Sequence, residues 1–283
     1  MSLSPTQSER REVVVFAGGL SPLDEAALAR AVAELSGSSV AMRLASAIGR
    51  QLGAAGLVAP PQIVAAVRSS AETAIRAAMA VALRSLPPER KDRNRMHKSV
   101  VTLAGAAGGA LGVAALPVEL PFTTTMMLRS IAAIAQDEGE DLADPETAIA
   151  CLEVFALGGE VGAETGETAG AEDMGYYAAR VMLAKMVSQS ARHLLHRGLA
   201  TDAAPLLTRL VSQIAARFGL VVSQKLAAQA VPLIGAASGA AINYAFVDHF
   251  QSLAHGHFTV RRLERAYGET LVRAQFERLR ARA

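Results

Sequence analysis

The sequence predicts an all-α protein, a compact bundle of helices, and three features of its composition support this. First, the 283 residues include 58 alanines, and alanine is the best helix former and is depleted in β-strands. Second, aromatic residues make up only 4% of the chain, and tryptophan is absent. Third, 51% of the residues are hydrophobic and 19% are charged. This apolar fraction is enough to build a core and excludes a disordered chain.

Helix start and stop signals divide the chain. Ser21-Pro22-Leu23-Asp24 combines an N-cap serine with proline in the first turn, and Asp144-Pro145-Glu146 repeats the pattern with aspartate as the cap. We expect residues 1–20 to be a mobile lead-in and residues 21–283 to form a single helical domain. The helices that we expect cover residues 22–35, 38–52, 60–86, 145–157, 176–197 and a segment from Thr201 or Asp202 toward Phe218.

Two central segments, rich in glycine and alanine, carry no charge. Residues 99–118 read SVVTLAGAAGGALGVAALPV, and residues 226–247 read LAAQAVPLIGAASGAAINYAFV. Glycines four residues apart, such as Gly105 and Gly109, allow helix backbones to approach closely. The length also suffices to cross a bilayer. Two interpretations therefore stay open: tightly packed buried helices, or helices that lie on or insert into a membrane.

Two segments are basic. Residues 89–98 carry five cationic side chains against two acidic ones, and residues 258–283 carry seven arginines against three glutamates. Residues 89–98 form either a solvated linker or helix face, or a basic patch near an anionic membrane. Residues 258–283 form either a terminal helix packed on the core with its arginines in water, or a helix that lies on an anionic membrane or docks on a partner. The side chains that we expect to contact a membrane are Arg90, Lys91, Arg93, Arg95, Lys98, Arg261, Arg262 and Arg265.

Three segments resemble one known family. They are LPVELPFTTTMMLRSIAAIAQDEGEDLADPETAIACLEVFALGG at 116–159, GYYAARVMLAK at 175–185 and QAVPLIGAASGAAINYAFVDHFQSLAHGHFTVRRLER at 229–265. Together they are similar to the EcsC protein family over about residues 90–268. The resemblance implies a largely helical bacterial protein, from a family named for a gene beside an ABC transporter operon. It implies no agreed catalytic set.

Glu119 stands between Pro117 and Pro121 in an apolar run. A carboxylate in such a place needs a partner, water or a raised pKa. Glu119 therefore caps the following helix, pairs with Arg129, or contacts a ligand.

A polar stripe is expected on the helix around residue 250. Tyr244, Asp248, Gln251 and His255 share one face of a helix, opposite Phe246, Val247 and Phe250. We expect Gly256 to break this helix before His257. The spacing fits no zinc signature, so no metal is expected. The candidate catalytic residues are Glu119, Asp248, His249 and His255, and the candidate ligand- or partner-binding residues are Glu119, Arg129, Tyr244 and Asp248.

The leading functional hypothesis is a non-enzymatic, cytoplasmic, membrane-associated protein that binds lipid or assists a membrane transporter or secretion system. A single cysteine, Cys151, fits a reducing compartment. The alternatives are a hydrolase that uses the four candidate catalytic residues, and a soluble helical interaction scaffold. No cofactor and no nucleic acid partner is expected, whereas oligomers are possible.

Overall fold

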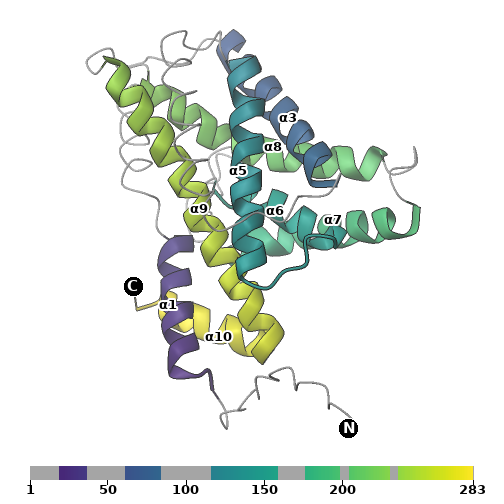
Figure 1. Cartoon of the computed structure of the whole chain (residues 1–283), viewed down its shortest axis with the longest axis vertical. Coiled ribbons are helices and arrows are strands. Elements are labelled where there is room, and N and C mark those ends of the chain that lie inside the picture. Colours follow the sequence, from purple (N-terminus) through teal and green to yellow (C-terminus); the bar gives the residue numbers. More distant parts are fainter. Residues whose placement is uncertain are drawn as a thin grey trace, which may run out of the picture.

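The computed structural model describes residues 19–36, 61–83, 116–158, 176–197, 204–229 and 235–282, and these residues confirm the all-α fold (Figure 1). Four predictions concern residues outside the described ranges: most of the lead-in, the helix over 38–52, the basic segment 89–98 and residues 99–115 of the first uncharged segment. The described helices are α1 (Pro22–Ser36), α3 (Pro61–Leu83), α5 (Leu116–Asp137), α6 (Pro145–Leu157), α7 (Tyr176–Arg197), α8 (Ala204–Gln229), α9 (Gly235–Tyr267) and α10 (Glu269–Arg280).

The predicted helix starts are confirmed by their caps. The Ser21 hydroxyl accepts a hydrogen bond from the Asp24 N–H at 3.1 Å and donates one to the Asp24 carboxylate at 2.8 Å. The Asp144 carboxylate accepts from the Glu146 N–H at 2.8 Å. Each cap satisfies a backbone donor that the first turn of a helix leaves unpaired. The caps therefore fix where α1 and α6 begin.

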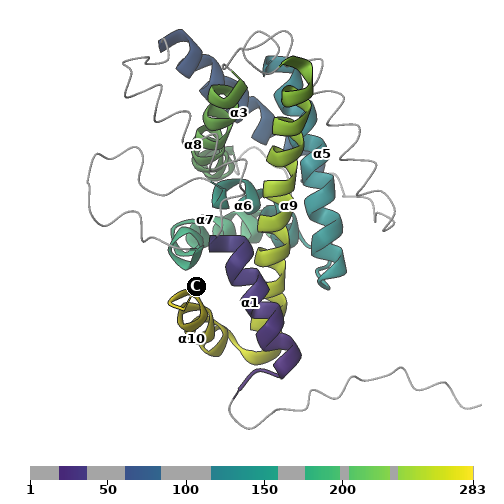
Figure 2. The same ribbon diagram turned by 90° about the vertical axis from the view of Figure 1, so that its left-hand side faces the viewer.

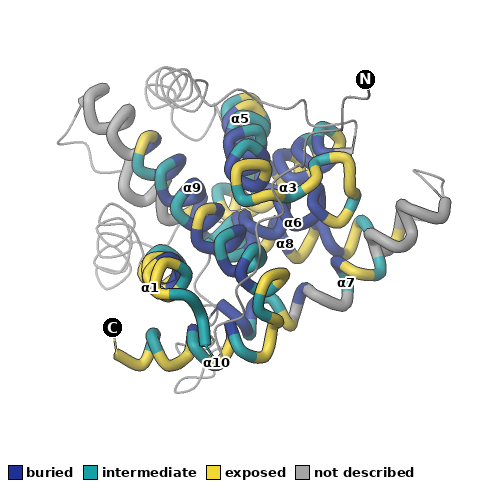
Figure 3. Tube along the Cα trace, turned by 60° about the horizontal axis from the view of Figure 1, so that its bottom comes forward, coloured by how far each residue is buried: buried dark blue, intermediate teal, exposed yellow. Residues whose placement is uncertain are grey.

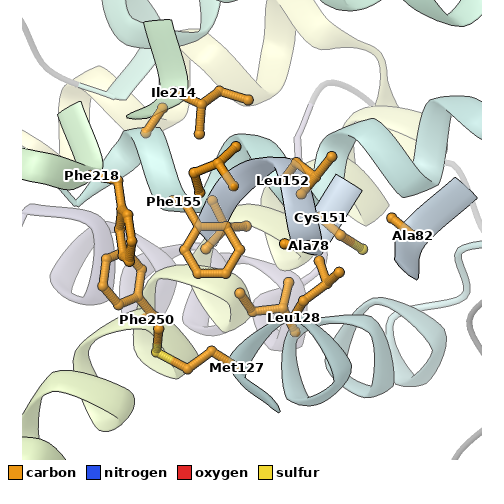
Figure 4. Close-up of a cluster of buried hydrophobic side chains, with 14 of the residues drawn as sticks. Ala78, Ala82, Met127, Leu128, Cys151, Leu152, Phe155, Ile214, Phe218 and Phe250 are labelled. Carbon is orange, nitrogen blue, oxygen red and sulfur yellow. The ribbon is translucent and has the colours of Figure 1, made fainter. Parts of the chain in front are cut away.

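Helix α6 is the centre of the main core. Its residues Thr147–Ala156 are all buried, and α3, α5, α7, α8 and α9 pack around it (Figure 3). Phe155 lies 5.3 Å from Phe218 of α8 and 5.4 Å from Phe250 of α9 between ring centroids (Figure 4). A helix whose faces are nearly all apolar is buried, and in the buried run of α6 Glu153 is the one charged side chain.

Helices α5 and α9 run in the same direction (Figure 2) and diverge toward their starts (Figure 1). Three side-chain hydrogen bonds join them or the turn after α5, and each links residues 121 positions apart: Ser130 with Gln251, Glu138 with Thr259, and Glu140 with Arg261. As a result, the starts of α5 and α9 lie at the same end of the pair.

A second, smaller core lies at the other end, where α1 and α10 pack beside the last turns of α9 (Figure 1). Gly268 separates α9 from α10 with φ of +87°, a conformation that favours glycine. The buried residues of this smaller core are Leu28, Ala31, Val32, Tyr176, Tyr177, Val260, Leu263, Val272 and Phe276.

The prediction that Gly256 breaks the helix is wrong, because α9 continues through it to Tyr267. A Cβ at Gly256 would lie 2.7 Å from Leu35 Cγ and 3.1 Å from the Ala31 carbonyl oxygen. Gly256 is therefore required for close contact with α1 and does not end the helix.

The second uncharged segment spans the end of α8 and the start of α9, and its residues 230–234 lie outside the described ranges. Helix α8 extends beyond the predicted Phe218 to Gln229, and α9 begins at Gly235, so residues 226–229 lie in α8 and residues 235–247 lie in α9. Among the described helices, none combines the length and apolarity needed to span a bilayer.

Candidate functional site

The arginines at the end of α9 bind acidic residues of the same chain. Arg261 donates to Glu140 at 2.9 Å, and Arg262 donates to Glu138 at 2.8 Å and to Asp24 of α1 at 3.1 Å. Arg265 also pairs with Glu140. These bonds join the α5–α6 turn and α1 to α9.

The ion pairs change the acidity of Glu140. Burial raises the pKa of its carboxyl, but hydrogen bonds from Arg261 and Arg265 outweigh burial and hold the pKa below its ordinary value. Arg261, Arg262 and Arg265 thus have a structural role, and contact of these side chains with a membrane stays a prediction.

Exposed apolar side chains lie in the first two turns of α5 and in the third turn of α9. Val118 is 79% exposed and Phe122 is 46% exposed, and they lie one turn apart on α5. Tyr244 of α9 is 46% exposed, and the register places it level with Thr123. We call these three residues the apolar end.

Glu119 lies in the first turn of α5, at the same end. A carboxylate there is favoured by the partial positive charge of the helix N-terminus, and the capping role of Glu119 stays a prediction. Arg129 lies ten residues further along, about 15 Å away along the helix axis. That separation is too long for a direct ion pair, so α5 does not bring Glu119 and Arg129 together.

The predicted polar stripe of α9 is only partly exposed. Tyr244 and His255 are exposed and Asp248 is half-buried, but Gln251 is buried and donates a hydrogen bond to the Ser130 hydroxyl of α5 at 2.5 Å. Gln251 therefore belongs to the interface between the two helices.

His249 points to the other side of α9. It is buried beside Gly158, where a Cβ would lie 3.1 Å from the histidine Nε2. Burial lowers the pKa of His249, opposed by the Gly158 backbone and by Asp248. Burial at the end of α6 thus favours the neutral form of the ring.

The four candidate catalytic residues do not converge. The register places Glu119 level with Ala240, about 12 Å along the axis from Asp248 and about 22 Å from His255. His249 is buried and His255 is exposed. Within the described ranges, no three histidine, cysteine, aspartate or glutamate side chains are grouped as metal ligands.

The structure also brings together a set that sequence reasoning missed, which we call the buried polar cluster. Tyr176 of α7 and His257 of α9 form a 2.9 Å hydrogen bond between the phenol oxygen and Nδ1. Arg180 donates twice to Glu264, at 2.8 and 3.0 Å. The members of the cluster are Glu153, Tyr176, Arg180, His257 and Glu264.

Glu153 is the most unusual member, because it is 5% exposed in the middle of α6. Burial raises the pKa of its carboxyl to about 7, partly offset by the charges of Arg180 and Arg261. Burial likewise lowers the pKa of His257 well below its ordinary value. The sequence contained a signal for this buried charge, because Glu153 is the lone charged residue in the run TAIACLEVFALGG.

A model of the EcsC protein family matches residues 35–263. The chain belongs to the EcsC protein family. Searches of curated proteins and of solved structures found no match. The EcsC match spans α3 to α9, and nearly all of α1 and all of α10 lie outside it. The EcsC region thus contains the apolar end and the buried polar cluster except Glu264, and the smaller core joins it to the two flanking helices.

Proposed function

We propose that this EcsC-family protein is a non-enzymatic, cytoplasmic, peripheral membrane protein whose apolar end lies against an anionic lipid surface. One observation carries the proposal: because α5 and α9 are parallel and in register, their exposed apolar residues are at the same end of the molecule.

The side chains at this end suit a lipid interface. Val118 and Phe122 share one face of α5, and Tyr244 adds an aromatic ring with a polar tip. Tyrosine favours the headgroup level of a bilayer because its ring is apolar and its hydroxyl is polar.

The neighbouring sequence has the same character. The uncharged residues 99–115 directly precede α5, and residues 230–234, also uncharged, directly precede α9. Residues 89–98, with five cationic side chains, come immediately before the first of these segments. Each cation near an anionic surface adds about 1 kcal/mol of attraction, which salt screens.

The hydrolase alternative is less well supported. It requires Glu119, Asp248, His249 and His255 to meet, and the register separates Glu119 from His255 by about 22 Å along the axis. This separation favours a binding role over hydrolysis at these residues.

Vesicle flotation tests the proposal. The wild-type chain is mixed with vesicles of phosphatidylcholine alone or with added phosphatidylglycerol, at low and at high salt. We expect flotation with the anionic vesicles at low salt and less at high salt. Val118→Asp with Phe122→Asp should abolish flotation, because both side chains are exposed and their replacement leaves the core intact.

Val181→Asp is the matched control. Val181 of α7 is 61% exposed, and it follows Arg180, which bonds to Glu264 near the other end of α9. The Val181→Asp variant should float like the wild type. If the wild type binds neither vesicle, or if the paired variant floats as well as the control, the proposal is wrong.

A further inference from the structure

Glu153 is the one charged side chain in the fully buried run of α6. Helices α3, α5, α7, α8 and α9 all pack against α6. A buried carboxylate is costly unless it is paired, and otherwise it takes up a proton. The groups around Glu153 therefore decide in which form it is held.

Charged groups approach Glu153 from three helices: Arg180 of α7, Arg217 of α8, and Arg261 and Glu264 of α9. Of the other two neighbours, α3 carries the surface ion pair between Glu72 and Arg76, and α5 carries the half-buried Arg129. Of the other titratable groups, Tyr176 lies near Glu153, His257 bonds to Tyr176, and Cys151 is two residues away on α6.

Two of these cations already bind other carboxylates. Arg180 donates twice to Glu264, and Arg261 donates to Glu140. An ionised Glu153 would compete with Glu264 for Arg180, whereas a protonated Glu153 would not. The charge on Glu153 therefore bears directly on the bond between Arg180 and Glu264.

Arg180 also connects the buried polar cluster to the smaller core. Its guanidinium lies 5.4 Å from the ring centroid of Tyr176 and 5.6 Å from that of Tyr177. Both rings pack on Phe276 of α10, at 5.4 and 5.2 Å. A displacement of Arg180 would change the packing of these tyrosines on α10.

We propose that the protonation state of Glu153 controls how tightly the start of α7 packs against α10. With Glu153 neutral, Arg180 stays on Glu264 and the two tyrosines stay on Phe276. With Glu153 ionised, Arg180 is drawn toward α6 and the contact with α10 loosens. Burial raises the pKa of Glu153 to about 7, so the change falls near neutral pH.

The tyrosines supply the measurement. The chain has four tyrosines and no tryptophan, and Tyr176, Tyr177 and Tyr267 all lie in or against the smaller core. Near-UV circular dichroism of the full chain at pH 6 and pH 8 therefore reports mainly on this region. Amide hydrogen exchange of α7 and α10, corrected for the intrinsic effect of pH, reports on loosening directly.

For the wild type we expect a weaker tyrosine signal and faster exchange at pH 8. The opening equilibrium should change by about tenfold for each unit by which the Glu153 pKa differs between the two states. Glu153→Gln, which stays neutral, should give the pH 6 behaviour at both pH values. Glu264→Gln weakens the hydrogen bonds to Arg180, so the amides of α7 and α10 should exchange faster than in the wild type at both pH values.

Glu34→Gln is the control, because burial also raises the pKa of Glu34 but this residue is not among the charged groups around Glu153. It should keep the wild-type response to pH. Two results would overturn the proposal: a wild type that responds to neither measurement between pH 6 and pH 8, or a Glu153→Gln variant that responds as the wild type does. The comparison of the wild type at pH 6 and pH 8 tests the proposal even if a variant does not fold.

Discussion

Gln251 of α9 donates a hydrogen bond to the hydroxyl of Ser130 on α5, and both side chains are buried between the two helices. Two further hydrogen bonds also join residues that are 121 positions apart, and together the three bonds define the parallel register of α5 and α9. The register brings the exposed Val118 and Tyr244 to the same end of the molecule. The proposed membrane surface depends on it.

Ser130→Ala should destabilise the fold by about 1–3 kcal/mol, because it leaves the buried Gln251 amide without its acceptor. Urea unfolding measures the change. Ser223→Ala is the matched control: its hydroxyl is exposed and bonds only to the Gly219 carbonyl of its own helix, so the change should stay within about 0.5 kcal/mol. Equal effects of the two substitutions would contradict the assigned interface.

Gly256→Ala should also destabilise the fold, because the new methyl group would lie 2.7 Å from Leu35 Cγ. We expect a loss of about 1–3 kcal/mol, recovered in part by adding Leu35→Ala. Gly219→Ala, also within a helix, meets only Ala71 Cβ at 3.8 Å. It should stabilise α8 by about 0.5–1 kcal/mol. Thermal unfolding of the three variants measures these changes in stability. A stabilising Gly256→Ala would refute the close contact of α1 with α9.

Glu140→Gln should cost about 1.5–3 kcal/mol at pH 7, since it weakens hydrogen bonds to two arginines. The pKa of Glu140 is lowered in the folded chain. Its stabilising effect is therefore present above its ordinary pKa of 4.5 and is lost as the pH falls through the lower folded value. Denaturant unfolding from pH 7 to pH 3 should show wild type and variant converging in acid. A constant difference would contradict the ion pair.

Glu153→Gln should have the opposite pH dependence. The pKa of Glu153 is raised from 4.5 to about 7 on folding, so its stabilising effect is complete below pH 4.5 and is lost as the pH rises through 7. At pH 8.5 the variant should be more stable than the wild type by up to about 3 kcal/mol, and near pH 4.5 the two should differ little. A variant that is less stable than the wild type at pH 8.5 would show that ionised Glu153 is well paired.

Cys151 should be inert in the folded chain. It is fully buried, and burial raises the pKa of its thiol. An aromatic disulfide reagent at pH 8 should react with less than one thiol per chain until urea is added. Rapid reaction of the native chain would show that α6 is accessible to solvent. An inert Cys151 also allows a cysteine placed elsewhere to be labelled alone.

Much of the helix pattern was predictable because its signals are local. The caps at Ser21 and Asp144 were read from adjacent residues, and each lies where expected. Gly256 was misjudged because its role depends on Leu35, more than two hundred residues away. A glycine that ends a helix and one that admits a neighbouring helix look the same in one sequence.

The site was harder to predict than the fold. The polar stripe of α9 follows from helical spacing, but only the partner helix shows that Gln251 is buried against Ser130. The buried polar cluster joins Glu153, Tyr176 and His257 from three helices, and no periodicity connects them. The parallel register of α5 and α9 is likewise a tertiary relationship.

The central claim is that the start of α5 contacts lipid, and a spin label tests it most directly. Val118→Cys and, separately, Val181→Cys are labelled with a nitroxide, and both positions are exposed. We predict that anionic vesicles shield the label at 118 from a water-soluble nickel reagent and open it to membrane-dissolved oxygen, with no change at 181. The claim is contradicted if vesicles leave the label at 118 as accessible to nickel as it is in buffer.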